Sequence, residues 1–173
     1  LEASPAERLE GSTAAAVAQA EDIATLALTA EMAGGMQRLL ELTVAYAKTR
    51  KQFDQPIGKF QAVQHMCADM FLWTESAKAA VYYAAYALDK GLPDAATAVS
   101  IAKVYAADAY RECGNRAIQV HGGMGFTWEC DAHLYYRRAK LSENAHGDSR
   151  YHRERIAQRI IDQRGTNEAA AAG

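Results

Sequence analysis

The sequence predicts an all-α protein, an antiparallel four-helix bundle with short extra helices. Apolar residues recur at spacings of three and four over long stretches, which is the period of one helix face. Glycine and proline separate these stretches, and few residues show the alternation typical of a β-strand. Long amphipathic helices joined by such turns pack as an antiparallel bundle.

We expect the bundle to occupy residues 21–163. Residues 1–20 contain Pro5, Gly11 and many small residues but little apolar mass, so we expect a linker from domains that precede the bundle. The chain begins with leucine rather than methionine, which suggests a piece of a longer protein. Residues 164–173 are expected to form a flexible tail.

The first predicted helix spans residues 21–50. Its apolar positions are Ile23, Leu26, Ala30, Ala33, Leu40, Val44 and Ala47. Gly34 and Gly35 lie inside this stretch, where they permit a close neighbour. Pro56 and Gly58 then indicate a turn.

The second predicted helix carries an apolar stripe over about six turns. The stripe comprises Phe60, Val63, Cys67, Met70, Phe71, Thr74, Ala77 and Val81, and Gly91 and Pro93 end the helix. Residues 94–120 form an alanine-rich third helix, whose small side chains favour tight helix–helix contact. Two shorter helices are expected at 131–143 and 148–163, with Asp148 or Ser149 as N-cap of the last one.

Composition excludes several classes of protein. The net charge of -2 argues against nucleic-acid binding, and no apolar run is long enough for a membrane span. Cys67, Cys113 and Cys130 are too few and too widely spaced for a disulfide framework or a zinc site. The five histidines lack HxxxH or HExxH spacing, so no metal is expected. Without signal-peptide features, the cytoplasm is the expected compartment.

The stretch from Gly122 to Gly125 holds three glycines within four positions. It follows no strand, which argues against a Rossmann motif. One interpretation is a helix stop made of left-handed glycines. The other is an open row of backbone N–H groups beside a polar ligand, with the amide of Gln119 nearby.

Three blocks of sequence resemble the C-terminal helical domain of the acyl-CoA dehydrogenases, in matching order and spacing. They are YAKTRKQFDQPIGKFQAVQHMCADM (46–70), AIQVHGGMGF (117–126) and RRAKLSENAHGDSRYHRERIA (137–157). The resemblance covers roughly residues 15–163. One departure is Asp54, at a position where the family usually has glycine.

This resemblance implies a flavin dinucleotide, FAD, shared between subunits. It places Arg50 on the pyrophosphate of a neighbouring subunit's FAD, where a guanidinium suits bidentate binding of phosphate oxygens. The other implied cofactor-binding residues are Gln52, Phe53, Gln61, Gln119, Gly122, Gly123, Gly147 and Ser149. From the residues alone, Arg50 also fits a solvated helix end and Gln61 a surface amide.

The reaction that the resemblance implies is α,β-dehydrogenation of an acyl-CoA thioester, with an electron-transfer partner to reoxidise the flavin. A base removes the α-proton while the β-hydride passes to the flavin. In the family's most common branch the base is a glutamate, whose position holds His146 here. A second branch carries its base on the first bundle helix, near Ala24. Glu21 and Glu31 lie one and two turns away and do not fit without a shifted helix.

Two mechanistic interpretations therefore remain. In the first interpretation, His146 is itself the base, since an imidazole titrates near neutrality. Alternatively, the chain is a subunit without its own glutamate in a heteromeric enzyme, and His146 is a capping or surface residue. The segment 127–140 resembles the subfamily in which mixed assemblies occur, including bacterial enzymes acting on steroid side-chain CoA thioesters.

The sequence also predicts assembly into a dimer or a dimer of dimers. Alanine-rich helix 94–111, with Tyr82, Tyr83 and Tyr86 on the preceding helix, gives more apolar surface than one bundle hides. A different class of function, a helical assembly module that has lost its substrate, stays open.

Overall fold

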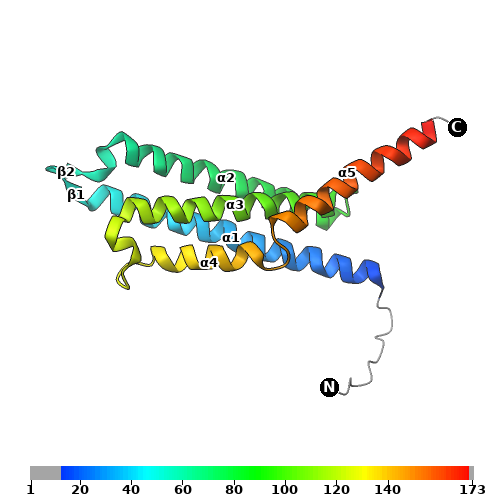
Figure 1. The fold of residues 1–173 in the computed structure, drawn as a ribbon, viewed down its shortest axis with the longest axis horizontal. Helices are drawn as coiled ribbons and strands as arrows, with labels where there is room; N and C mark the ends of the chain where they lie inside the picture. Colours follow the sequence, from blue (N-terminus) through cyan, green and yellow to red (C-terminus); the bar gives the residue numbers. More distant parts are fainter. Residues whose placement is uncertain (1–12, 172–173) are drawn as a thin grey trace, which may run out of the picture.

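The computed structural model describes residues 13–171 and confirms the all-α fold. Its helices are α1 (Ala14–Thr49), α2 (Gln61–Lys90), α3 (Ala95–His121), α4 (Ala132–Asn144) and α5 (Ser149–Ala171). Figure 1 shows α1 to α4 side by side in one bundle, while α5 leaves it at the end opposite the hairpin. Helix α3 packs against all four other helices.

Helix α1 begins at Ala14, seven residues before the predicted start, so residues 14–20 of the expected linker are helical. The side chain of Thr13 accepts a hydrogen bond from the Ala16 amide at 3.1 Å, which caps the first turn. Alanine has the highest helix propensity, so this exposed segment needs no apolar face to be helical. Residues 1–12 lie outside the described part of the chain.

Helix α5 also differs from its predicted bounds, because it continues beyond residue 163 to Ala171. The residues expected to form a flexible tail are therefore helical up to that point. At its start, Asp148 Oδ1 accepts a hydrogen bond from the Tyr151 amide at 2.8 Å. Of the two predicted N-cap residues, Asp148 thus has the capping contact.

A short antiparallel hairpin connects α1 and α2. Its strands are β1 (Lys51–Gln52) and β2 (Gln55–Pro56), followed by the 3-10 turn η1 (Ile57–Lys59). Phe53 and Asp54 form the hairpin tip with φ of 52° and 63°. A second 3-10 turn, η2 (Gly122–Phe126), follows α3.

The main core lies between α1, α2 and α3, with α4 covering one side. Its largest fully buried members are Met32, Met36, Leu39, Met70, Tyr110 and Cys113. A Cβ on Gly35 would lie 2.3 Å from the hydroxyl oxygen of Tyr110, so only glycine lets α1 approach α3 here. This confirms the expected close neighbour for Gly35, whereas a Cβ on Gly34 would meet nothing within 4 Å. Within the described residues, no helix is long and apolar enough to cross a membrane.

Candidate functional site

The ends of α1 and α3 meet through Tyr46 and His121. Their rings stack with centroids 4.4 Å apart, and the Tyr46 hydroxyl lies 3.5 Å from the His121 carbonyl oxygen. The imidazole of His121 is held in turn by the Ala117 carbonyl, 2.8 Å from Nδ1. Because Arg50 follows α1 and Gly122 follows α3, this contact brings both predicted cofactor residues to one end of the bundle, here called the hairpin end.

Arg50 ends α1 in an extended conformation, and its N–H donates to the Tyr46 carbonyl at 2.8 Å. Its side chain is exposed and makes no hydrogen bond or ion pair with the described residues. Gln52 is also exposed, and its amide donates to the Lys51 carbonyl. Phe53 is 86% exposed, and its ring makes an edge-to-face contact with that of Phe60, with centroids 6.0 Å apart. These side chains are free to contact a ligand outside the bundle.

The glycines after α3 divide into two kinds. Gly122 ends the helix with φ 60° and ψ -140°, so the expected helix stop is present at this residue, but its backbone lies outside the left-handed helical region. A Cβ on Gly122 or Gly123 would meet nothing within 4 Å, so open space lies above this backbone. Gly125 instead packs inward, where a Cβ would lie 3.1 Å from the Ile118 carbonyl oxygen. The helix stop and the open backbone thus coexist in one turn.

Gln119 and Gln61 are exposed, on the last turn of α3 and at the start of α2. The hairpin end therefore gathers a guanidinium, amide side chains, an exposed aromatic ring and open glycine backbone. A pyrophosphate with an attached nucleoside fits this set of donors and apolar surface. Figure 1 shows the hairpin and the turn after α3 at the same end of the bundle.

The remaining predicted residues lie far away, beside a cavity of about 260 Å³. This cavity, here called the polar cavity, is lined by Glu21, Thr25, His146, Gly147, Tyr151 and Arg155. Ala24 precedes one of these lining residues on α1. Ala24 itself is not among the residues that line the cavity, so of the two positions considered for a base only that of His146 borders it. Ser149 begins α5 just after His146 and Gly147, and its buried hydroxyl has no hydrogen-bond partner among the described residues.

Glu21 lines the polar cavity together with His146, although the sequence comparison argued against a fit. Glu21 and Thr25 are four residues apart, so they share one helix face. Glu31 lies elsewhere: both of its carboxylate oxygens accept hydrogen bonds from Arg138 at 2.6 Å. These bonds lower the pKa of Glu31. Glu21 is therefore the carboxylate of α1 that faces this cavity, and Glu31 is not.

Sequence reasoning missed the ion pair between Asp22 and Arg155. The guanidinium donates to Asp22 Oδ1 at 2.7 Å, and the two side chains are 7% and 16% exposed. Arg155 also lies 5.8 Å from the ring of Tyr151. The available signal was an acidic residue on the apolar side of a predicted helix, but its partner is 133 positions away.

No group of three or more potential metal-binding side chains occurs within residues 13–171. The distance between the two sets of predicted residues follows from α1. Twenty-five residues separate Thr25 from Arg50, which at 1.5 Å per residue is about 38 Å. The hairpin and the connection between α4 and α5, which carries His146 and Gly147 of the polar cavity, lie toward opposite ends of the bundle (Figure 1).

The family model described as acyl-CoA dehydrogenase, C-terminal domain, matches residues 15–161. Acyl-CoA dehydrogenase IpdE2 of Mycolicibacterium smegmatis is 37% identical over 140 residues, 81% of this chain and 43% of that protein. Acyl-CoA dehydrogenase FadE34 of Mycobacterium tuberculosis is 47% identical over 120 residues, 69% of this chain and 17% of that protein. The chain thus spans less than half the length of these relatives.

Solved structures agree with the family. The glutaryl-coenzyme A dehydrogenase–glutaryl-CoA complex superposes with a TM-score of 0.82 at 30% identity, over 86% of this chain and 38% of that one. PigA with FAD and proline gives 0.78 at 31% identity, over 81% and 36%. The expected cofactor, FAD, agrees with the latter structure. Because the family model matches nearly the whole described chain, the chain belongs to the acyl-CoA dehydrogenase family and corresponds to its C-terminal domain.

Proposed function

We propose that the chain forms the C-terminal domain of an FAD-dependent enzyme that dehydrogenates an acyl-CoA thioester between Cα and Cβ. The observation that carries this proposal is the separation of the two predicted sites by about 38 Å along α1. A single dinucleotide does not bridge that distance. One chain therefore offers its hairpin end to a neighbour's FAD and its polar cavity to its own.

At the hairpin end, Arg50 would hold the pyrophosphate through charge-assisted hydrogen bonds, and its exposed side chain is free to do so. The open backbone at Gly122 and Gly123 admits the nucleoside portion without a clash. When bound, FAD supplies the acceptor for the β-hydride. An electron-transfer partner would then reoxidise the reduced flavin.

At the polar cavity, the position of the family's glutamate holds His146, and Ala24 occupies the alternative position. We propose that a partner subunit supplies the carboxylate base and that this chain is the FAD-binding subunit of a heteromeric enzyme. Arg50 and the glycine turn would then serve the partner's flavin, while the α-proton leaves through the partner's carboxylate.

One observation favours a homomeric enzyme instead. Glu21 and His146 line the same cavity, so a carboxylate and an imidazole are both available near the substrate position. In this alternative, the imidazole or the carboxylate accepts the α-proton. The two candidates differ only in which chain carries the base.

Anaerobic flavin bleaching by acyl-CoA tests the proposal. The full-length protein is purified alone and together with its co-encoded partner, and the flavin absorbance is followed after substrate addition. We expect bound flavin in the joint preparation and bleaching only there. Rapid bleaching by the homomeric preparation would contradict the heteromeric proposal, and absence of flavin from both would contradict the cofactor proposal. A series of acyl chains then identifies the substrate.

A further inference from the structure

Two fully buried polar side chains lie against the backbone between α4 and α5. Lys103 on α3 and His152 on α5 are both 0% exposed. Burying such groups is unfavourable unless they are hydrogen bonded. Both direct nitrogen atoms at backbone carbonyls of residues 142–146, the segment that leads into the polar cavity.

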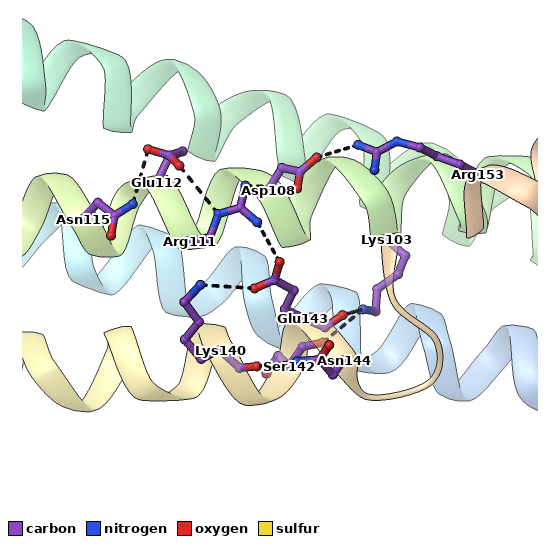
Figure 2. Close-up of polar contacts among 10 residues, drawn as sticks. All are labelled: Lys103, Asp108, Arg111, Glu112, Asn115, Lys140, Ser142, Glu143, Asn144 and Arg153. Atoms are coloured by element: carbon purple, nitrogen blue, oxygen red, sulfur yellow. Dashed lines mark hydrogen bonds and ion pairs between the residues drawn. The ribbon is translucent and has the colours of Figure 1, made fainter. Parts of the chain in front are cut away.

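Lys103 binds the C-terminal end of α4. Its Nζ donates to the carbonyl oxygens of Ser142 and Glu143, each at 3.0 Å (Figure 2). The last carbonyls of a helix lack partners within the helix, so the bonds from Lys103 take the place of the missing helical hydrogen bonds. The carboxylate of Glu143 is held separately by Arg111 at 2.6 Å. Burial lowers the pKa of Lys103, but the neutral amine still has the two N–H groups that these bonds need.

His152 binds a carbonyl oxygen three residues further along the chain. Its Nε2 lies 2.9 Å from the His146 oxygen, and its Nδ1 lies 3.3 Å from Ser100 Oγ. Because a carbonyl only accepts, Nε2 carries the proton. Burial lowers the pKa of His152, and among its charged neighbours Lys103 and Arg155 lower the pKa further while Asp22 opposes them.

The turn that receives these bonds has an unfavourable backbone conformation. His146 has φ 55° and Gly147 has φ 92°. A left-handed conformation is costly for a residue with a side chain and persists only where the surroundings fix it. A Cβ on Gly147 would also lie 2.3 Å from Cδ1 of Tyr151, so the turn packs tightly on α5.

We propose that Lys103 and His152 are positioning residues. Their buried donors hold the carbonyl side of residues 142–146 against the bundle, so that His146 and Gly147 line the polar cavity. Ser100 adjoins this arrangement, because its Oγ lies 3.3 Å from Nδ1 of His152 and donates to the Ala96 carbonyl oxygen at 3.1 Å. The consequence for flavin and substrate rests on the proposed function, whereas the anchoring of the turn does not.

Hydrogen–deuterium exchange on the full-length holoprotein tests the anchoring. We expect amides of residues 142–150 to exchange about tenfold faster in His152→Leu and Lys103→Met, since a lost buried hydrogen bond is worth about that factor in a local opening equilibrium. His152→Gln keeps a side-chain N–H donor and should exchange within about threefold of the parent protein. Thr74→Val is the matched control, because Thr74 is equally buried but bonds the Met70 carbonyl, away from residues 142–146.

A second readout separates positioning from general stability. Visible circular dichroism of the bound flavin should change in His152→Leu and return in His152→Gln, while Thr74→Val leaves it unchanged. If His152→Leu does not fold, Ser100→Ala replaces it, with an expected increase in exchange of about threefold. Unchanged exchange at 142–150 in folded Lys103→Met and His152→Leu, or in folded Ser100→Ala, would overturn the proposal. Because exchange requires no turnover, an inactive parent protein would count against the proposed function alone.

Discussion

Arg155 on α5 donates to Asp22 on α1 at 2.7 Å, and the Asp22 side chain is 7% exposed. This contact joins the helix that leaves the bundle to the first half of α1 and supports one wall of the polar cavity. Removing one partner of such a buried pair leaves an uncompensated charge. We expect Arg155→Met to lower the free energy of unfolding by about 3–5 kcal/mol.

Urea denaturation measures this effect. The double variant Asp22→Leu with Arg155→Met should recover most of the loss, because it removes both charges. Arg138→Met is the control, since it breaks the exposed Glu31–Arg138 pair and should cost less than about 1 kcal/mol. Equal losses for Arg155→Met and Arg138→Met would contradict the burial argument.

The buried imidazole of His152 should make the protein sensitive to acid. Burial holds its pKa below 6.5, the value expected when unfolded, so the unfolded state binds the proton more readily. The stability that neutral His152 contributes is therefore fully present above pH 6.5. It is lost as the pH falls from 6.5 toward the pKa of His152 in the folded protein. We expect His152→Gln to lose less stability than the parent protein from pH 7 to pH 5, measured by urea midpoints. His65→Gln, at an exposed position on α2, should behave like the parent. The same acid loss in His152→Gln would contradict this assignment.

Exposed tyrosines on α2 are expected to contribute to a dimer or tetramer. Tyr82 and Tyr86 are 71% and 54% exposed, and they lie one turn apart on the same helix face. Tyr82→Arg with Tyr86→Arg should shift the oligomer toward smaller species in light scattering at micromolar concentration. Tyr83→Phe keeps the ring and serves as control. A monomeric parent protein would contradict this prediction.

His146→Ala distinguishes the two positions proposed for the base. If a partner subunit supplies the carboxylate, the variant should change the rate of flavin reduction by less than about tenfold, measured by stopped-flow bleaching. If His146 is the base, the loss should be about 10²–10⁴-fold. Glu21→Gln provides the parallel measurement for the other titratable group of the cavity. We expect small effects for both, and a large loss in either would favour the homomeric enzyme.

The bundle could be predicted because periodicity records which helix face is buried. The ends of its helices were less predictable. The first turns of α1, for example, depend on Thr13 as a cap and on the helix propensity of alanine rather than on apolar spacing. The hairpin end followed from a family resemblance in contiguous motifs. The contacts of Lys103 and the Asp22–Arg155 pair could not be predicted from the sequence, because each joins residues 39 or more positions apart. No local pattern specifies such partners.

Flavin retention by Arg50→Ala tests the shared flavin site most directly. The full-length variant and its parent are purified with the partner. Each preparation is diluted in steps, and the FAD that stays bound is measured from its absorbance at each protein concentration. Loss of a charge-assisted phosphate contact should weaken FAD binding by about 1.5–3 kcal/mol while the helical circular dichroism stays unchanged. Arg50→Lys should restore part of the loss, because the lysine lacks the guanidinium fork. Lys48→Ala, which removes another exposed charge from the end of α1, should retain FAD. Unchanged FAD retention in Arg50→Ala would contradict the account.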